Sequence, residues 1–302
     1  MTSAFQARVV CVRSREFAVQ VEGERDRILV TVPKKLRFQN PGFVDPVAVG
    51  DMVRVADGVV EGVEPRRNAI TRPASGRGGK RQVLAANVDL ALIMQAAASP
   101  VWKPATFDRY LVMASVCGVP AAVCINKIDL DPLAAADPVF AEYTRLGILA
   151  LPFSARTGEG MEAIEAALRG RISVLLGPSG VGKSSVVNRL LPVDAARVGE
   201  VSERTGKGTH TTTWVDSLDV PGGGRIIDSP GLRVLDLTGV RPADLALHFP
   251  EFGEAAACRF PDCAHLAEPG CGVKAAAEAG VVAAGRYDSY CRIHDSLIRG
   301  RG

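Results

Sequence analysis

The chain has 302 residues, of which 47% are hydrophobic and 23% charged, which is the balance of an ordinary folded protein and excludes wholesale disorder. This length gives two domains of about 150 residues each as a first expectation. The net charge is only +3, but residues 1–81 carry 15 basic and 9 acidic side chains. A basic segment of this kind is typical of proteins that bind nucleic acid.

The sequence carries no targeting or membrane signal that we can identify. Its first residues lack the basic-then-apolar pattern of a signal peptide. The two longest apolar runs, Val83–Ala98 and Leu111–Ile125, are interrupted by polar residues, Gly or Pro before they reach the ~18 residues of a membrane span. Seven cysteines, three of them between residues 258 and 271, favour metal ligation over a secreted disulfide framework. We therefore expect a cytoplasmic protein with no membrane partner.

The first 72 residues have the pattern of a small all-β domain. Short segments rich in Val and Ile alternate with turn residues, and no helical periodicity is present. The expected strands are Ala7–Val12, Phe17–Glu22, Arg27–Val32, Asp51–Val55 and Gly58–Val63. Five such strands predict an OB-like β-barrel, a fold that often binds oligonucleotides. A barrel without an RNA role fits the same pattern equally well.

A basic segment follows the barrel. Six basic residues and no acidic one lie between Pro65 and Arg81. On charge alone, Arg66, Arg67 and Arg72 are candidate RNA contacts. Residues 73–81 are rich in Gly and basic side chains and are predicted to be a mobile linker.

Strands and helices alternate from residue 82 to residue 240, which predicts a central α/β domain with a parallel sheet covered on both faces. The expected strands are Val88–Met94, Ala121–Ile125, Ile148–Pro152, Ile172–Leu176 and Arg225–Ile227. The expected helices are Phe107–Val116 with Thr106 as N-cap, Phe140–Leu146, Gly160–Leu168 and Lys183–Leu191. Residues 241–302 have a helical, irregular pattern and form a third module.

A phosphate-binding loop lies between an expected strand and an expected helix. Residues 177–184 match the pattern G-x-x-x-x-G-K-[ST] in the context that the motif requires. Lys183 would place its charge on the β- and γ-phosphates, and the Ser184 hydroxyl would bind Mg²⁺. The predicted contacts to the nucleotide are Gly177, Pro178, Ser179, Gly180, Val181, Gly182, Lys183, Ser184 and Ser185.

Two further loops indicate that the base is guanine. Asn126, Lys127, Ile128 and Asp129 follow the strand Ala121–Ile125. The Asp129 carboxylate can accept hydrogen bonds from N1–H and the exocyclic amine of guanine, a donor pair that adenine does not offer. Asn126 and the stem of Lys127 would fix this loop and cover the base. Ser154 and Ala155 follow the next strand, and we expect the Ala155 N–H group to donate to guanine O6.

The segment from Asp228 to Gly231 completes the predicted triphosphate site. Asp228 would hold Mg²⁺, and the Gly231 N–H group would donate to the γ-phosphate. Residues 205–213 are polar and punctuated by Gly, as expected of a switch loop, in which Thr211 or Thr212 would complete the Mg²⁺ shell. The sequence does not discriminate between the two threonines.

Leu232 occupies the position after Gly231, where Ras-like enzymes carry a glutamine that orients water. A leucine side chain cannot polarise water, so we expect slow intrinsic hydrolysis. His210 is the nearest candidate for a catalytic role, because a neutral imidazole can orient the attacking water. A role in positioning the switch or contacting RNA is an equal alternative for this residue.

The order of the motifs is permuted. The two guanine loops precede the phosphate loop, whereas an ordinary small GTPase has them after it. The chain therefore runs from the segment Asp228–Gly231 directly into the C-terminal module. That module contains Cys258, Cys263, His265 and Cys271, a Cys₃His set that would form a closed, structural zinc site. A set of buried thiols is the alternative interpretation.

With these motifs in place, the chain resembles the circularly permuted GTPases of small-ribosomal-subunit biogenesis in bacteria, the RsgA family. The resemblance covers about residues 80–302, and the barrel matches in character and position. It rests on Asn126–Asp129, Ser154–Ala155, Gly177–Ser184, His210–Thr213, Asp228–Gly231 and the segment Cys258–Cys271. It implies a multidomain chain with an N-terminal OB-like barrel (1–72), a permuted GTPase domain (82–240) and a C-terminal helical zinc-binding domain (241–302).

The resemblance also implies a function. It implies low intrinsic hydrolysis of GTP to GDP, stimulation by the small ribosomal subunit, and late maturation of that subunit through contacts with its ribosomal RNA. The expected cofactors are Mg²⁺ with GTP and one structural Zn²⁺ per chain, and we expect a monomer. The alternative from another class is a non-catalytic RNA-binding adaptor in which GTP is only a structural ligand, which Leu232 would permit. Asp129 disfavours an ATP-dependent kinase or nuclease.

Overall fold

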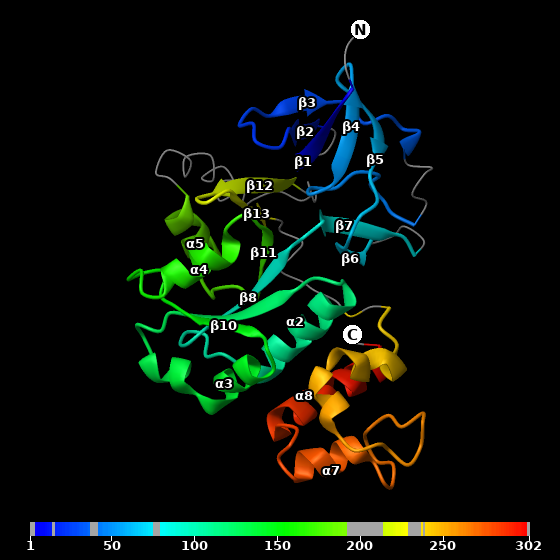
Figure 1. The fold of residues 1–302 in the computed structure, drawn as a ribbon, viewed down its shortest axis with the longest axis vertical. Helices are drawn as coiled ribbons and strands as arrows, with labels where there is room; N and C mark the ends of the chain where they lie inside the picture. The colour runs from blue at the N-terminus through cyan, green and yellow to red at the C-terminus, as the bar shows by residue number, and fades with distance from the viewer. Residues whose placement is uncertain are drawn as a thin grey trace. The chain divides into compact units, whose positions relative to one another are not determined.

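The computed structural model describes residues 4–13, 16–36, 42–74, 79–191, 214–228, 237 and 239–300 (Figure 1). The chain forms two compact units, each assembled from several stretches of sequence. The first unit consists of residues 1–91, 161–176 and 183–234, and the second of residues 92–160, 177–182 and 235–302.

Five strands at the start of the first unit form a closed barrel. They are β1 (Phe5–Arg13), β2 (Glu16–Gln20), β3 (Ile28–Val30), β4 (Met52–Ala56) and β5 (Val59–Val63). β1 pairs with β2 and β4, β2 with β3, and β4 with β5, all antiparallel. A parallel bridge between Thr31 and Val59 closes the ring. Val9, Val19, Val53 and other small apolar side chains fill the interior, which confirms the predicted barrel.

Residues 73–81, predicted to be a mobile linker, begin and end in the paired residues of two strands. β6 (Ala69–Pro73) and β7 (Arg81–Ala86) form an antiparallel hairpin in which Pro73 pairs with Arg81. The Ala74 N–H group donates to the Lys80 carbonyl at 2.9 Å, so both ends of the Gly-rich segment are held by the hairpin. Ile70 and Leu84 are fully buried. Burial of these apolar side chains stabilises a pair of strands whose connecting segment alone resembles a linker.

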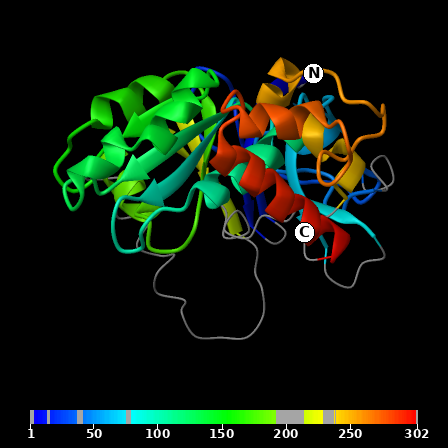
Figure 2. The same cartoon turned by 90° about the horizontal axis from the view of Figure 1, so that it is seen from below.

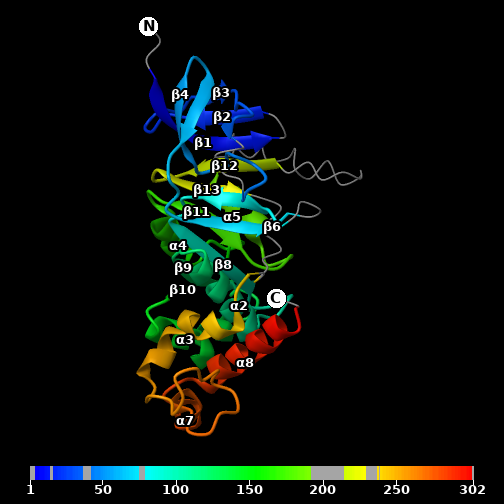
Figure 3. The ribbon, with the colours of Figure 1, turned by 90° about the vertical axis from the view of Figure 1, so that its right-hand side faces the viewer.

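The first unit also contains β11 (Ile172–Leu176), β12 (Trp214–Val220) and β13 (Gly224–Asp228), with the helices α4 (Met161–Leu168) and α5 (Lys183–Leu190). β11 and β13 are parallel, as expected, and β12 is antiparallel to β13. β1 of the barrel pairs with the outer edge of β12, so that the strands follow one another in the order β11, β13, β12, β1 (Figure 3). The sheet is therefore mixed, and β12 is a strand that the sequence pattern did not indicate.

The second unit begins with most of β8 (Leu90–Ala96) and continues with β9 (Ala121–Asn126) and β10 (Leu149–Pro152), in the order β10–β9–β8. β9 and β10 are parallel. The helices α2 (Pro104–Val116) and α3 (Pro138–Arg145) confirm the expected alternation. The predicted N-cap at Thr106 is wrong, because Lys103 is the N-cap and Pro104 is the first helical residue. Proline suits this position, where its missing N–H group would have no helical partner.

The C-terminal part of the second unit is helical and irregular, as predicted. It consists of the 3₁₀ turns η3 (Pro242–His248) and η4 (Pro250–Glu254) and of the helices α7 (Gly272–Glu278) and α8 (Ala284–Ile298). α8, the long red helix of Figure 2, packs against α2. Among the described residues, no helix is long and apolar enough to cross a membrane.

A buried ion-pair network joins α8 to α2 and η4. Arg286 of α8 donates to Asp108 of α2 at 2.5 Å and to Glu251 of η4 at 2.6 Å. These three side chains are at most 4% exposed. Tyr143 of α3 donates its hydroxyl hydrogen to Asp108 at 2.8 Å. Burial raises the pKa of Asp108, and the neighbouring guanidinium of Arg286 opposes that rise.

Replacing Arg286 by alanine is expected to lower the free energy of unfolding by about 3–5 kcal/mol, because two buried carboxylates would lose their cation. Urea unfolding measures this change. Arg292→Ala is the matched control, since Arg292 lies on the same helix in an exposed ion pair with Asp288, and it should lower the free energy by about 0.5 kcal/mol at most. Equal destabilisation by the two variants would contradict a structural role for the buried network.

Candidate functional site

The loop between β11 and α5, the predicted phosphate-binding loop, contains three glycines with a positive φ. Gly177, Gly180 and Gly182 have φ values of 137°, 81° and 96°, a region that side-chain-bearing residues rarely adopt. A Cβ atom at Gly177 would overlap the carbonyl oxygen of Met94. The glycines are therefore required by the path of the chain, and the pattern G-x-x-x-x-G-K-S reflects backbone geometry here.

Asn126 ties the predicted phosphate loop to both predicted base-recognition loops of the second unit. Its side-chain amide donates to the Val181 carbonyl at 2.9 Å. Its Oδ1 atom accepts the N–H groups of Lys127 at 2.8 Å and Ala155 at 3.0 Å. The side chain is buried, so these bonds are shielded from water. The Ala155 N–H group, predicted to donate to guanine O6, is thus already used, and a guanine would share it with Asn126.

Lys127 joins its own loop to Ser99 and to the predicted phosphate loop. Its backbone has a φ of 65°, and its Nζ atom donates to the carbonyls of Ser99 at 2.6 Å and Gly180 at 2.8 Å. The aliphatic stem is therefore fixed along the phosphate loop. Ile128, the next residue, is buried and donates its N–H group to Phe153 O at 3.4 Å.

The Asp129 carboxylate is occupied on both oxygens. Ser154 donates its hydroxyl hydrogen to Oδ1, and Arg156 donates from Nε at 2.9 Å and Nη2 at 2.6 Å to Oδ2. The hydrogen bond from Ser154 and the interaction with Arg156 hold the pKa of Asp129 below its ordinary value. Asp129 is therefore ionised at neutral pH, which is the state that accepts two N–H donors.

Three residues predicted to act on the triphosphate belong to the first unit. Lys183 and Ser184 begin α5, directly after the phosphate loop, and Asp228 ends β13. Because β11 and β13 are parallel with Val174 opposite Ile227, their carboxyl ends lie at the same edge of the sheet. Asp228 and the start of the phosphate loop therefore leave the sheet from neighbouring strands, as a Mg²⁺–phosphate site requires.

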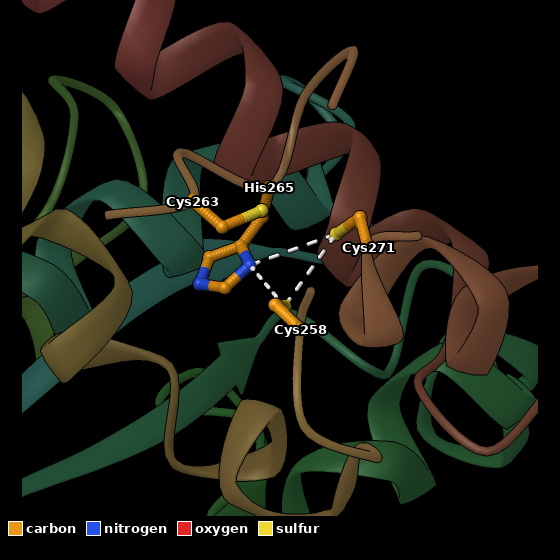
Figure 4. A group of neighbouring side chains, drawn as sticks. All are labelled: Cys258, Cys263, His265 and Cys271. Atoms are coloured by element: carbon orange, nitrogen blue, oxygen red, sulfur yellow. Dashed lines mark hydrogen bonds between the residues drawn. The ribbon is translucent and has the colours of Figure 1, made fainter. Parts of the chain in front are cut away.

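Four side chains in the C-terminal part of the second unit converge on one point (Figure 4). The ligand atoms of Cys258, Cys263, His265 and Cys271 all lie within 4.8 Å of one another. His265 Nδ1 is 3.4 Å from Cys258 Sγ and 3.6 Å from Cys271 Sγ, and these two sulfurs are 4.0 Å apart. The edges of a tetrahedral site with Zn–S bonds of about 2.3 Å and Zn–N bonds of about 2.0 Å are roughly 3.5–3.8 Å long. The atoms of Cys258, His265 and Cys271 are therefore spaced close to the edges of a tetrahedral site, and the four residues together could hold a metal ion.

Backbone groups and a carboxylate order the metal-binding loop. The N–H groups of Gly272 and Lys274 point at the sulfurs of Cys258 and Cys271, both at 3.3 Å. Glu268 accepts the N–H groups of Ala264 and Leu266, both at 2.9 Å. Hydrogen bonds from backbone N–H groups lower the pKa of Glu268 to about 2. Burial lowers the pKa of His265, which keeps the imidazole neutral and able to bind a metal.

Known proteins are similar in sequence to this chain over most of its length. The family model described as RsgA GTPase matches residues 63–238. The protein of Gemmatimonas aurantiaca named small ribosomal subunit biogenesis GTPase RsgA is 40% identical over 281 residues, covering 90% of this chain and 91% of that protein. The chain belongs to the RsgA GTPase family. It is therefore a GTPase, and its guanine loops precede its phosphate loop.

A further relative and two solved structures are similar to this RsgA-family chain over most of its length. The protein of the same name from Azotobacter vinelandii is 45% identical over 291 residues, with 92% of this chain and 82% of that protein covered. The crystal structure of YjeQ from Thermotoga maritima is 32% identical with a TM-score of 0.80, covering 98% of this chain and 99% of that one. The structure of YloQ, a circularly permuted GTPase, is 25% identical with a TM-score of 0.74, covering 99% and 96%. The fold with its permuted order of motifs is that of this family.

Several predicted site residues lie outside the described part of the chain. They are His210, Thr211, Thr212 and Gly231, together with Leu232. The choice between the two threonines and the role of His210 therefore stay predictions.

The three arginines chosen as RNA contacts in this RsgA-family chain have different surroundings. Arg66 pairs with the fully buried Asp51 at 2.7 Å, and its side chain is only 13% exposed. Arg72 donates to the side chain of Gln82 at 2.8 Å. Arg67 pairs with Asp89 at 2.8 Å but keeps 62% of its side chain exposed. Of the three, Arg67 has the side chain most accessible to an RNA phosphate.

Two residues of the site were missed by the sequence argument, Arg156 and Glu268. Arg156 directly follows Ser154 and Ala155, and its basic charge two residues after a predicted base contact was a usable signal. Glu268 lies between two metal ligands in the sequence. An acidic residue inside a ligand loop suggests support of the loop, but its backbone partners depend on the fold.

Proposed function

We propose that this GTPase acts in the biogenesis of the small ribosomal subunit, in late maturation, through contacts with ribosomal RNA. The relatives named above carry a name that states the first part of this role. The closed barrel and the basic residues that follow it suit an RNA partner. We further propose that the subunit stimulates hydrolysis and that the protein acts in the cytoplasm as a monomer.

The observation that carries the proposal is the hydrogen-bond network of Asn126. It connects the loop of Asp129, the loop of Ser154 and the phosphate loop within one unit. These loops would bind the base and the phosphates of one GTP molecule. The proposed nucleotide contacts are Asn126, Lys127, Ile128, Asp129, Ser154, Ala155, the residues 177–185 and Gly231.

Hydrolysis would proceed by in-line attack of water on the γ-phosphate, as in other GTPases. Lys183 would stabilise the negative charge that develops on the phosphate oxygens. Ser184, Asp228 and either Thr211 or Thr212 would hold Mg²⁺, which neutralises charge on the β- and γ-phosphates when it is bound. His210 would either orient the water or position the switch, and RNA of the subunit would order that segment.

We propose that the Cys₃His site holds one Zn²⁺ with a structural role. Three thiolates and one imidazole are ligands that Zn²⁺ prefers, and four protein ligands leave no open position for catalysis. We also propose a functional division into the barrel (1–72), the GTPase domain (82–240) and the metal-bearing domain (241–302), in which the C-terminal domain follows the segment of Asp228 directly. A change of that segment with the nucleotide state would reach the metal-bearing domain along the chain.

GTP turnover by the purified protein, measured alone, with small subunits and with large subunits, tests this proposal. We expect slow turnover alone, because Leu232 cannot orient water, and an acceleration of tenfold or more with small subunits, since ordering of one catalytic group contributes roughly 10²–10⁴-fold. Large subunits are the control and should have no effect. Equal stimulation by both subunits, or by neither, would contradict the proposed partner.

A further inference from the structure

Arg156 is bonded to the carboxylate that the proposed function assigns to the edge of the guanine base. The Asp129 carboxylate, which would accept the guanine donors, is bonded to Ser154 at Oδ1 and to Arg156 at Oδ2. Ser154 is fully buried and held in its turn by hydrogen bonds with Glu159 O and Gly158 N. The Arg156 side chain is 73% exposed. Of the two partners of Asp129, only Arg156 can therefore leave without disturbing the fold.

The two donors of Arg156 resemble those of the base. Nε and Nη2 of a guanidinium lie side by side in one plane, and both donate to Asp129 Oδ2, at 2.9 and 2.6 Å. Guanine presents N1–H and the exocyclic N–H in the same side-by-side manner. Both donor pairs need the same acceptor group, the Asp129 carboxylate. The guanidinium and the base therefore compete for Asp129.

We propose that Arg156 is an internal competitor of guanine, which caps the Asp129 carboxylate in the nucleotide-free chain and is displaced when the base binds. This proposal rests on the assignment of Asp129 to the guanine site. The ion pair keeps the carboxylate charged and partnered while the site is empty. It also lowers the affinity for guanine nucleotides, because each binding event breaks it. Arg156 thus adjusts nucleotide affinity without contributing to hydrolysis.

The Arg156→Ala variant tests this competition with a fluorescent methylanthraniloyl derivative of GDP. We expect its affinity to rise about two- to five-fold, the range that the loss of one exposed ion pair corresponds to, with the larger part of the rise in the association rate. Arg145→Ala is the matched control, because Arg145 is an exposed arginine paired with Glu142 in the same unit, away from Asp129. It removes the same charge and should leave the affinity unchanged.

The same substitution made in the Asp129→Asn variant separates this proposal from the assignment of Asp129 to the guanine site. In Asp129→Asn the ion pair is absent, so adding Arg156→Ala should leave the affinity for the corresponding xanthosine diphosphate derivative unchanged. An unchanged or lowered GDP affinity in the single variant would overturn the proposal, since Arg156 would then be neutral or would hold the bound base. If Asp129→Asn itself leaves the preference for GDP over ADP intact, the guanine site is elsewhere and the proposed function fails first.

Discussion

Asp129→Asn is expected to lower the affinity for GTP by roughly 10²- to 10⁴-fold. Two hydrogen bonds to a charged acceptor contribute about 1.5–3 kcal/mol each, and every 1.4 kcal/mol is a factor of about ten. The variant should gain affinity for XTP, because the asparagine carbonyl accepts the N1–H of xanthine and its amide donates to the carbonyl that replaces the exocyclic amine. Equilibrium binding of GTP, XTP and ATP derivatives measures both changes.

Asp131→Asn is the matched control for this experiment. Asp131 lies two residues further along the same loop, where its side chain accepts the Leu133 N–H group at the start of η1 (Pro132–Ala136). Asparagine keeps that cap, so nucleotide affinity should not change. If Asp129→Asn and Asp131→Asn bind GTP equally well, Asp129 does not recognise the base.

Cys271→Ser is expected to abolish metal binding in the C-terminal part of the second unit. The native chain should contain about one zinc ion, held by four ligands, and the variant close to none. Structural zinc contributes about 10–16 kcal/mol in small zinc-binding peptides at neutral pH, so the loop around Glu268 should become accessible to protease. Metal analysis of the purified protein and limited proteolysis measure the two effects.

The chemistry of this position makes the substitution a specific test. Cys271 is also the N-cap of α7, where its sulfur accepts the Lys274 N–H group. Serine is a good N-cap residue, so loss of the cap would not explain a loss of structure. Cys291→Ser, on α8 and outside the ligand set, is the control and should keep the metal. Retention of zinc by Cys271→Ser would show that this cysteine is not a ligand.

Local patterns predicted most of the fold. The five barrel strands, the helices α2 to α5 and the phosphate loop all follow from periodicity or from glycines with a required conformation. The expected strands omit β6, β7 and β12, and two of these, β6 and β12, have sequences that do not favour a strand alone. β6 contains Thr, Arg and Pro, and β12 contains two aspartates and a serine. They are strands because β7 in one case, and β13 and β1 in the other, supply hydrogen-bond partners.

The residues of the candidate site also divide into those that the sequence predicts and those that depend on the fold. Residues within a short motif, such as Asn126 to Asp129, could be chosen from sequence because their spacing is set by one loop. The hydrogen-bond partners of these residues could not be predicted from the sequence. Val181, which accepts from Asn126, is 55 residues away along the chain. The pairing of Arg66 with Asp51 shows the converse, since a basic residue selected for RNA on charge alone is engaged by a buried carboxylate of its own unit.

β1 pairs both with β4 of the barrel and with β12, and this limits how the barrel can be separated from the rest of the chain. Phe5 to Arg8 pair with β4 inside the barrel, while Cys11 to Arg13 pair with β12 of the nucleotide-binding sheet. Arg27 adds an ion pair to Asp216 at 2.9 Å across the same boundary. A fragment cut after residue 72 would therefore expose an open strand edge, the kind of surface on which chains aggregate. The RNA binding proposed for the barrel is best studied by point substitution in the intact chain.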